Sequence, residues 1–367
     1  MKKICHITSA HPPEDIRIFK KECVSLAKAG FDVYLVQRGE SYEKEGVHII
    51  GFGNVCGGRI KRFSYYSYKA YKLALDIDAD LYHIHDPELL PYAMLFLLKG
   101  KKVIFDSHEI YFYQILTKEY IPILLRKFIS RAYHVLETII CRRIDGVIAC
   151  AYVNGKNTFE NRSKSITMIF NYPILDKFFP EVSQIEIKDN ICFVGRISRE
   201  RGIPMLAKTS NEIDIKLVLA GKFSDEILEK EIMSFKNIKY YGMVDQNKIR
   251  SIINNSFCGA CIFRNVGQHS YMEAFPTKVL EYLACGVPVI LNNNKFNIEF
   301  IKNNRVGLVI DPDNKDEVGK AIMYLYKNPD IAKQMGELGR KIVVDKYSWQ
   351  SQEKKLINFY NQILKEG

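Results

Sequence analysis

Short apolar runs alternate with amphipathic stretches along most of the chain. The first run, at residues 4–7, reads as a buried strand and is followed by a loop with two prolines. Apolar positions at helical spacing then predict a helix from about 16 to 28, which stops at Gly30, and DVYLV (32–36) predicts the next strand. This is one βαβ unit.

The same alternation continues and then restarts. Further strands of the first half are predicted at 81–84, 102–105 and 146–149. A second series is predicted at 190–195, 216–221, 238–242, 258–263, 288–291 and 307–310. The proline-flanked segment 171–182 separates the two series. We therefore expect an α/β protein with two Rossmann-like domains facing a cleft, at 1–172 and 173–345, and a final helix at 346–367 that packs back on the first domain.

Composition changes this picture little. Hydrophobic residues make up 47% and charged residues 26% of the 367 positions, which excludes disordered, collagen-like and coiled-coil classes. The opening residues lack the apolar core of an export signal, and the longest apolar stretch, near 89–98, is about half of what a bilayer requires. Nine cysteines without regular spacing suit free thiols. The single CxxC, Cys258 and Cys261, lies in an apolar run that favours a strand over a zinc site.

A net charge of +11 points to an anionic partner: nucleic acid, a membrane surface or a phosphorylated substrate. Two segments mix basic and apolar residues. Residues 118–143 hold six basic and two acidic residues, and residues 59–72 interleave cations with aromatic rings: Arg59, Lys61, Arg62, Phe63, Tyr65, Tyr66, Tyr68, Lys69, Tyr71 and Lys72. Both segments suit an interfacial surface or ordinary helices that cover a sheet. Nucleic-acid binding fits the charge, but no recognition motif accompanies it.

The stretch EAFPTKVLEYLACGVPVI (273–290) predicts a site at the start of a helix. Pro276 and Thr277 suit the first turn, and Gly286 suits the end. Glu273 is thus expected in a loop before the helix and Glu281 about one turn inside it. The free amides of a first helical turn bind anions. Carboxylates beside such amides suit a ligand that carries both phosphates and hydroxyls, although each glutamate alone reads as a solvated helix charge.

The segment FVGRISRERG (193–202) adds cations. Gly195 ends a predicted strand, and three arginines follow within six residues: Arg196, Arg199 and Arg201. Guanidinium groups offer paired donors to phosphate oxygens. By itself this segment is equally consistent with a solvated basic turn, but with residues 273–290 it predicts a diphosphate site.

These two segments resemble the retaining glycosyltransferases of family 4, which have the GT-B fold, and within them a bacterial surface-polysaccharide subgroup. The E-x7-E signature of that family matches Glu273 and Glu281, and its G-R-x-S-x-x-K-G segment matches Gly195, Arg196, Ser198 and Gly202. The resemblance extends over nearly the whole chain. It implies an acceptor-binding first domain and a nucleotide-sugar-binding second domain.

The resemblance also implies residue roles. Arg196 would bind the donor diphosphate, Glu281 the ribose hydroxyls and Glu273 the hydroxyls of the transferred sugar. Arg201 stands where the family usually has lysine, and Thr277 and Lys278 would lie against the phosphates. In the first domain FDSHE is similar to the active-site histidine segment, which nominates His108 as catalytic along with Glu273 and Arg196.

Three features of the first domain complete the comparison. His83, His85 and Asp86 also match a family segment and are expected to shape the fold. HPPEDIRIF (11–19) stands where the family has a tight glycine turn. A metal-binding DxD could be read from Asp76, Asp78 and Asp80, but these acids precede a strand at the end away from the expected cleft. We therefore expect no metal and no cofactor, the nucleotide sugar being a substrate.

The resemblance predicts a hexosyl- or N-acetylhexosaminyltransferase. It would move a sugar from a UDP-sugar, such as UDP-GlcNAc or a UDP-hexose, to an undecaprenyl-linked saccharide, with retention, in capsule or O-antigen synthesis. Such an enzyme would be cytoplasmic and peripheral on the inner face of the plasma membrane, with an anionic membrane surface and no nucleic acid among its partners. A UDP-GlcNAc 2-epimerase on the same fold and a non-catalytic nucleotide-binding protein remain alternatives.

Overall fold

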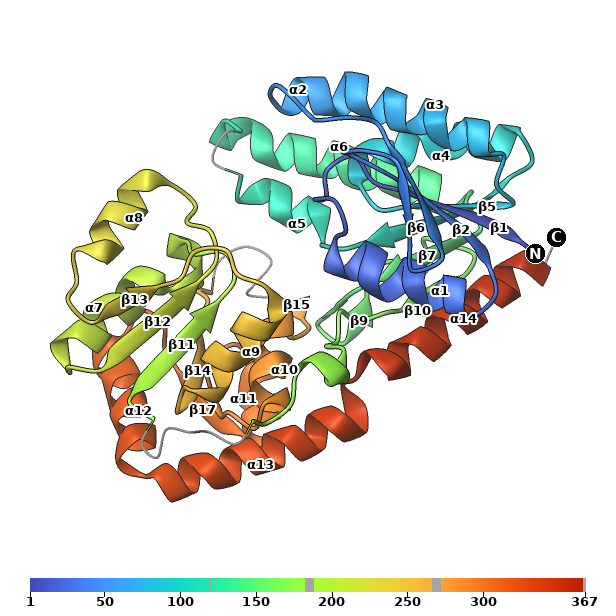
Figure 1. Ribbon diagram of the computed structural model, residues 1–367. Helices are drawn as coiled ribbons and strands as arrows, with labels where there is room; N and C mark the ends of the chain where they lie inside the picture. The colour runs from blue at the N-terminus through green and yellow to red at the C-terminus, as the bar shows by residue number, and fades with distance from the viewer. Residues whose placement is uncertain (119–120, 182–187, 266–271, 366–367) are drawn as a thin grey trace. The chain divides into compact units, whose positions relative to one another are not determined.

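The computed structural model describes residues 1–118, 121–181, 188–265 and 272–365, and the chain divides into two compact units (Figure 1). Unit 1 consists of Met1–Asn171 together with Gln350–Gly367, and unit 2 of Tyr172–Trp349. The chain thus leaves unit 1 and returns to it in α14 (Trp349–Lys365), which starts three residues after the predicted boundary at 346.

Unit 1 contains an eight-stranded sheet in the order β10-β7-β6-β5-β1-β2-β4-β3. Neighbouring strands are parallel, except that β3 runs antiparallel to β4. The strands are β1 (Lys3–Ile7), β2 (Asp32–Gln37), β3 (Tyr42–Lys44), β4 (Val47–Gly51), β5 (Leu81–Ile84), β6 (Lys102–Ser107), β7 (Gly146–Ala149) and β10 (Ile166–Met168). Two short strands, β8 (Tyr152–Val153) and β9 (Lys156–Asn157), form an antiparallel pair.

Helices cover both faces of this sheet. One face carries α2 (Arg59–Lys61), η2 (Arg62–Tyr66), α3 (Ser67–Ile77), η3 (Pro87–Leu89), α4 (Leu90–Leu98), α5 (Tyr111–Leu116) and α6 (Ile123–Cys141). The helix predicted at 16–28 lies on the other face, where its first part, η1 (Ile16–Cys23), is a π-helix and only α1 (Val24–Lys28) is α-helical. Side chains alternate across a strand, so the imidazoles of His6 and His83 point to this second face, where they meet Tyr360 of α14.

Unit 2 has a six-stranded parallel sheet in the order β13-β12-β11-β14-β16-β17, the strand order of dinucleotide-binding folds. The strands are β11 (Asn190–Val194), β12 (Lys216–Ala220), β13 (Ile238–Tyr240), β14 (Cys258–Cys261), β16 (Val289–Asn292) and β17 (Gly307–Ile310). The interior positions of β11, β12, β14 and β16 are buried, which explains why these strands read as apolar runs. Cys258 and Cys261 are buried free thiols in β14, as expected of a strand.

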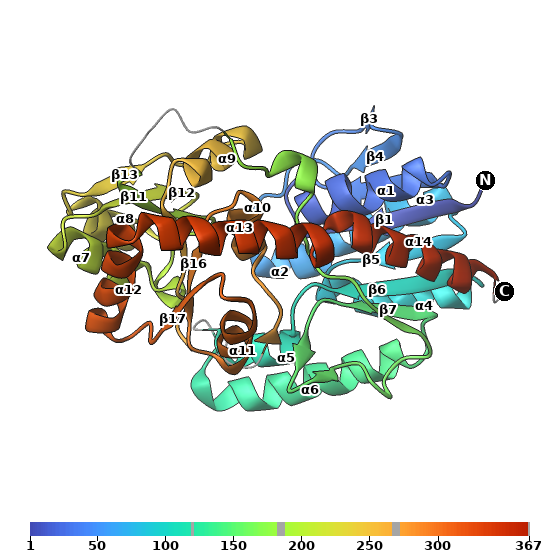
Figure 2. The same ribbon diagram turned by 90° about the horizontal axis from the view of Figure 1, so that it is seen from below.

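The remaining elements of unit 2 surround this sheet. They are η4 (Leu175–Lys177), η5 (Arg199–Arg201), α7 (Ile203–Glu212), α8 (Glu226–Met233), α9 (Gln246–Asn254), β15 (Met272–Glu273), α10 (Thr277–Ala284), α11 (Lys295–Asn304), α12 (Lys315–Lys327) and α13 (Pro329–Lys346), which Figure 2 shows from below. Side-chain caps start several helices: Asp225 accepts from the amide of Leu228, and Asp245 from that of Lys248. Within the described residues, no helix is both long and apolar enough to span a bilayer.

Candidate functional site

The carboxyl ends of β11 and β12 require two glycines. Gly221 has φ +136°, and a Cβ placed there would lie 2.0 Å from the carbonyl oxygen of Gly195. Gly195 itself has φ +116°. Both conformations are ones that L side chains rarely adopt, and the approach of the two backbones leaves no space for a methyl group. The glycines therefore let the two chain segments leave the sheet at close distance.

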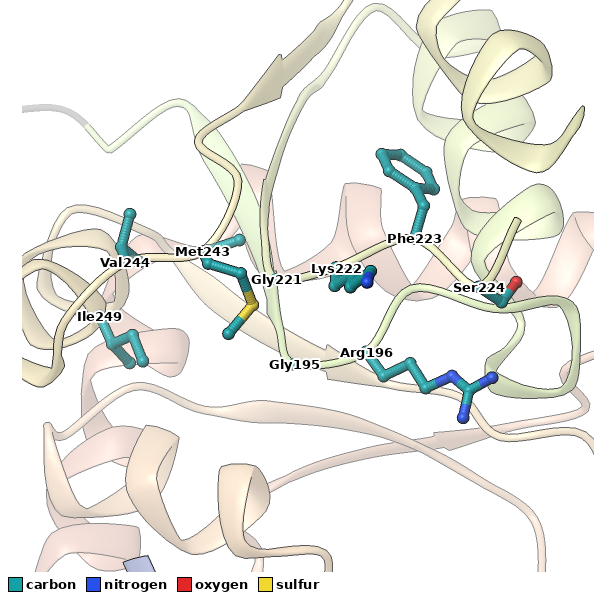
Figure 3. Close-up of a pocket in the computed structure, with 10 residues that line it drawn as sticks. Gly195, Arg196, Gly221, Lys222, Phe223, Ser224, Met243, Val244 and Ile249 are labelled. Carbon is teal, nitrogen blue, oxygen red and sulfur yellow. The ribbon is translucent and has the colours of Figure 1, made fainter. Parts of the chain in front are cut away.

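A pocket of about 540 Å³ opens where these segments leave the sheet (Figure 3). Its polar part includes the side chains of Arg196, Lys222 and Ser224. Its apolar part is formed by Phe223, Met243, Val244 and Ile249. Ligands of parallel α/β sheets bind at the carboxyl ends of strands, where this pocket lies. A wall of apolar side chains next to two cations can hold an aromatic base against the wall and phosphates near the charges.

The basic segment after β11 continues from this pocket into η5. Ser198 is fully buried, and its hydroxyl has no hydrogen-bond partner among the described residues. Gly202 is left-handed, with φ +74°, and a Cβ there would lie 2.2 Å from the carbonyl oxygen of Ile262. Arg201 stacks its guanidinium 5.2 Å from the ring centre of Phe263 and donates to the carbonyl of Arg196 at 3.4 Å. These two contacts hold the guanidinium of Arg201 close to the backbone of Arg196.

Helix α10 begins at Thr277, directly after Pro276, which has an extended backbone, and Gly286 follows its end with φ +71°. Glu281 lies inside the helix, as predicted. One prediction was wrong: Glu273 is not in a loop but in β15, a strand of only two residues. Pairing of so short a strand depends on distant parts of the chain, which local sequence does not reveal.

Lys278 occupies an unusual environment at the start of α10. Its side chain is buried, and its ammonium nitrogen lies 3.5 Å from the ring centre of Phe193 without a hydrogen-bond partner among the described residues. Burial lowers the pKa of Lys278 to about 7. A buried amine without a partner gains most from an arriving anion.

Three of the predicted donor-binding residues converge. A Cβ on Gly195 would lie 3.0 Å from Nζ of Lys278 and 3.5 Å from Nη1 of Arg201, and Arg196 follows Gly195 in the chain. Glu281 lies close enough to Lys278 to raise its pKa, against the larger effect of burial. The roles predicted for all six donor-binding residues, Glu273, Thr277 and Glu281 included, are not tested by this geometry and stay predictions.

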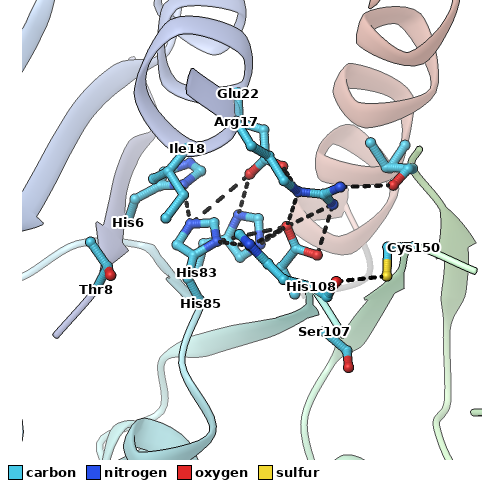
Figure 4. Close-up of polar contacts among 12 residues, drawn as sticks. His6, Thr8, Arg17, Ile18, Glu22, His83, His85, Ser107, His108 and Cys150 are labelled. Carbon is cyan, nitrogen blue, oxygen red and sulfur yellow. Dashed lines mark hydrogen bonds and ion pairs between the residues drawn. The ribbon is translucent and has the colours of Figure 1, made fainter. Parts of the chain in front are cut away.

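Unit 1 holds His108 at the end of β6. Its Nε2 lies 3.1 Å from Oδ2 of Asp106 and 3.0 Å from Nδ1 of His85 (Figure 4). Arg17 of η1 binds both oxygens of Asp106 at 2.9 Å. Burial alone would raise the pKa of Asp106, but the charge of Arg17 and the bonded histidine hold it well below its ordinary value. Asp106 is therefore a buried anion that fixes the orientation of the His108 ring.

A chain of hydrogen-bonded rings continues inward from His108. Nε2 of His85 contacts Nδ1 of His6 at 2.8 Å, and the hydroxyl of Tyr360 contacts both His6 and His83. Burial lowers the pKa of His6 and His83 well below the ordinary value and that of His85 to about 4. The three inner imidazoles are thus neutral. As expected, His83 and His85 form part of the interior, and Asp86 accepts from Thr8 and Ser9.

This cluster has the ligand types of a transition-metal site. Donor atoms of His6, Glu22, His83 and His85 lie within 4.8 Å of one another, and those of His85, Asp106 and His108 form a second group. However, His6, His85 and His108 already bond to one another through ring nitrogens, Nδ1 of His83 bonds to Tyr360, and the guanidinium of Arg17 contacts Glu22 at 3.0 Å. A cation there would have to displace these bonds beside an existing positive charge. The expectation of no metal stays a prediction.

The loop between β1 and η1 adds His11 to this edge. Its ring centre lies 4.8 Å from that of His108, and its two nitrogens lie 3.5 Å from Asp15 and Asp86. Burial would lower the pKa of His11, but the hydrogen bond to Asp15 and the charge of Asp86 outweigh burial and raise it. His11 belongs to the segment HPPEDIRIF (11–19), which stands where the family has a tight glycine turn.

Sequence reasoning missed several residues of these sites. The pocket residues Met243 and Ile249 follow β13 in a loop and in α9, and only the strand order brings them next to Gly195. Arg17 and Asp106 were also missed. The available signal was the position of Asp106, a charged residue directly after the apolar residues 103–105 of β6, because a buried carboxylate requires a partner.

Models of two known protein families match the two halves of the chain. Residues 21–153 match the model described as Glycosyltransferase Family 4, and residues 176–342 match Glycosyl transferases group 1. The capsular polysaccharide biosynthesis glycosyltransferase CapM of Staphylococcus aureus is 26% identical over 191 residues, 49% of this chain and 48% of that protein. The chain spans about half the length of the curated relatives it matches.

Solved structures extend the likeness to the whole fold. Sucrose-phosphate synthase from Thermosynechococcus elongatus has a TM-score of 0.78 at 17% identity, with 100% of both chains covered. Anabaena HepE in complex with UDP and glucose has a TM-score of 0.73 at 13% identity, covering 99% of this chain and 100% of that one. The strand order of unit 2, the pocket lined by glycines and the two family models all indicate the same fold and the same family. The chain belongs to the GT-B glycosyltransferases of family 4.

Proposed function

We propose that this protein transfers a sugar from a nucleotide donor to a saccharide acceptor, with a UDP-sugar such as UDP-GlcNAc or a UDP-hexose as donor and retention at the anomeric carbon. One observation carries the proposal. The pocket at the ends of β11 and β12 joins an apolar wall to a cluster of cations, with Lys278 buried and without a hydrogen-bond partner among the described residues. The UDP-bound neighbour HepE supports the choice of nucleotide.

The base of the donor would lie against the apolar wall of the pocket. Arg196, Arg201, Lys278 and the first-turn amides of α10 at Thr277 would hold the diphosphate. By the family resemblance, Glu281 binds the ribose hydroxyls and Glu273 the hydroxyls of the transferred sugar. Negative charge develops on the departing diphosphate, so donors fixed in advance lower the barrier for its departure.

Retention requires that the acceptor hydroxyl approach from the face that the diphosphate leaves. We assign its proton to a donor phosphate oxygen, so that Glu273 positions the sugar and does not attack it. His108, oriented by Asp106, would serve as the catalytic histidine. In this scheme the bond from the anomeric carbon to the phosphate oxygen breaks, a bond to the acceptor oxygen forms, and no metal or other cofactor takes part.

The acceptor would be an undecaprenyl-linked saccharide at the inner face of the plasma membrane, in capsule or O-antigen synthesis. The support is the resemblance to a bacterial surface-polysaccharide subgroup and the similarity to CapM, a capsular polysaccharide biosynthesis glycosyltransferase. The protein would then be a cytoplasmic, peripheral enzyme whose excess of positive charge favours anionic lipid.

Kinetics of three variants test the site. We expect Arg196→Ala and Glu281→Ala chiefly to raise KM for the donor, and His108→Ala to lower kcat, measured as UDP release with a saccharide acceptor. Arg264→Ala is the matched control, because Arg264 is an exposed arginine of unit 2 paired to Asp313. Near-normal kinetics in all three site variants would remove the assignment.

Measurements with nucleotide sugars also separate the two alternative functions, a 2-epimerase and a non-catalytic nucleotide-binding protein. A 2-epimerase converts free UDP-GlcNAc without an acceptor, which NMR of the sugar anomeric region detects. A non-catalytic protein shifts its melting temperature with UDP yet never releases UDP from a donor. Either result would overturn the transferase proposal, and a thermal-shift screen against nucleotide sugars identifies the donor.

A further inference from the structure

Helix α6 exposes an unusual number of apolar side chains. Leu124 is 90% exposed, Ile123 75% and Phe128 72%. The exposed apolar residues of α6 continue along the helix: Leu125, Ile129, Val135, Leu136 and Ile139. Recurrence at three- and four-residue spacing places many of them on one side of the helix. A contiguous apolar face of this kind marks an interaction site in a soluble protein.

The inward side of α6 is partly polar, which is the reverse of an ordinary sheet-covering helix. Ser130 donates to the carbonyl of Phe112, and Glu137 is buried in an ion pair with Arg162. Apolar contact with the sheet comes mainly from the end of the helix, at Ile140 and Cys141. The outer apolar residues are therefore not needed to cover the sheet.

The exposed charges of α6 itself have one sign. Lys127 and Arg131 are exposed on α6, and Arg142 and Arg143 follow its end. Throughout Ile123–Cys141, all of which the structure describes, the single acid is the buried Glu137. The outer surface of α6 thus combines apolar side chains with positive charge alone.

A second exposed segment lies on the same helical layer. Tyr71 of α3 stacks on Tyr92 of α4, and α4 packs against α6, so that all three cover the same face of the sheet (Figure 1). Ile60 is 87% exposed, and Phe63, Tyr65 and Tyr68 are about half exposed. Tyr66 and Tyr71, which the sequence pattern grouped with these anchors, are instead buried in the core. The side chain of Arg59 lies outside the described part.

We propose that the outer face of α6, flanked by the α2–η2 segment, docks on an anionic lipid surface. Apolar side chains would enter the boundary between headgroups and acyl chains, and the cations would meet lipid phosphates. The inference rests on the proposed function in one respect, because a lipid-linked acceptor resides in such a surface. A second copy of the chain is disfavoured as occupant, since a two-fold interface would bring like charges together.

Vesicle co-sedimentation tests the proposal with the full chain. We expect binding to vesicles of phosphatidylglycerol and phosphatidylcholine at low salt, and much weaker binding to phosphatidylcholine alone. The double variant Leu124→Ser/Phe128→Ser should bind at least about tenfold more weakly. Ile227→Ser is the matched control, because Ile227 is an exposed apolar residue of α8 in unit 2. Each of Lys127→Gln and Arg131→Gln should weaken binding roughly fivefold.

Two results would overturn the proposal: absence of binding to the anionic vesicles, or unchanged binding by the double variant. A dimer seen by light scattering that the double variant abolishes would identify a second copy as the occupant and would also overturn it. Donor hydrolysis and UDP thermal shifts, measured without lipid on the same proteins, separate this inference from the proposed function. A parent protein that uses the donor but does not bind the anionic vesicles would reject only the docking surface and leave the proposed function standing.

Discussion

Asp106 bonds to His108 through a single nitrogen of the ring, Nε2, at 3.1 Å. Because Arg17 keeps Asp106 ionised, the carboxylate accepts a hydrogen bond and Nε2 carries the proton. The other nitrogen, Nδ1, is then the ring atom of His108 that could contact a substrate. The hydrogen-bonding capacity of His108 is therefore set by residues that do not themselves need to touch the substrate.

Replacing Asp106 should impair turnover more than donor binding. We expect Asp106→Asn to lower kcat on the order of 10- to 100-fold, because the amide no longer fixes the ring and its proton. The pH profile of kcat should shift as well, which a purely structural defect would not cause. UDP affinity, measured by calorimetry, should stay the same. Glu137→Gln, at another buried carboxylate of unit 1, controls for general destabilisation.

UDP binding should depend on pH through Lys278. The pKa of this buried amine, about 7, leaves it mostly neutral above that pH, and a bound diphosphate would favour its protonated form. Affinity should therefore fall as pH rises from about 7.5 to 9.5, by up to about tenfold per unit. Calorimetry in two buffers of different ionisation enthalpy should reveal proton uptake. Lys278→Met should lose both effects, and a flat profile in the parent protein would contradict the site.

Gly221 and Gly242 allow a comparison of backbone strain. Gly221→Ala should lower the free energy of unfolding by more than about 3 kcal/mol, because the methyl group adds a collision with Gly195 to the strain of a positive φ. Gly242 also has a positive φ, +67°, but open space around it. Gly242→Ala should cost only about 1–2 kcal/mol. Equal losses in denaturant unfolding would mean that the two strands do not approach as described.

His11 should stabilise the fold only at lower pH. The folded-state pKa of His11 is raised above that of the unfolded chain, so its stabilisation is complete below about pH 6 and is lost as pH rises through the folded pKa. His11→Asn should therefore reduce the free energy of unfolding at pH 5.5 and have little effect at pH 9. A difference between variant and parent that is the same at both pH values would show that Asp15 and Asp86 do not stabilise the charged ring.

Sequence pattern predicted the five central strands of the first sheet because parallel strands of an α/β sheet are buried on both faces, but it missed β3, β4 and β10 at the sides of that sheet. Residues 146–149 are an example: all four are buried in β7, at the predicted positions. Periodicity also predicted that residues 118–143 contain an amphipathic helix. Periodicity could not determine which side of that helix faces the protein. The same spacing of apolar residues occurs when the apolar face covers a sheet and when it faces outward.

Features that depend on distant contacts were not predictable. Glu273 lies in a strand of two residues, which has no pattern of its own. The π-helical turns of η1 were read as ordinary helix because eight residues are too few for the spacing of apolar positions to distinguish the two helix types. The chain of imidazoles from His108 to His83 likewise results from the parallel register of β1 and β5, which sets His6 beside His83. A single sequence lists these histidines but does not place them together.

The return of the chain in α14 has a consequence for biosynthesis. Phe359 packs over Gly146, and Tyr360 completes the interior around His6, so unit 1 needs residues from near both ends of the sequence. The nascent sheet must wait, with this interior open, until position 360 has emerged from the ribosome. Unit 2 (Tyr172–Trp349) lacks this dependence and can reach its native state before position 360 emerges. Unit 2 can therefore fold before unit 1, although most of unit 1 is translated first.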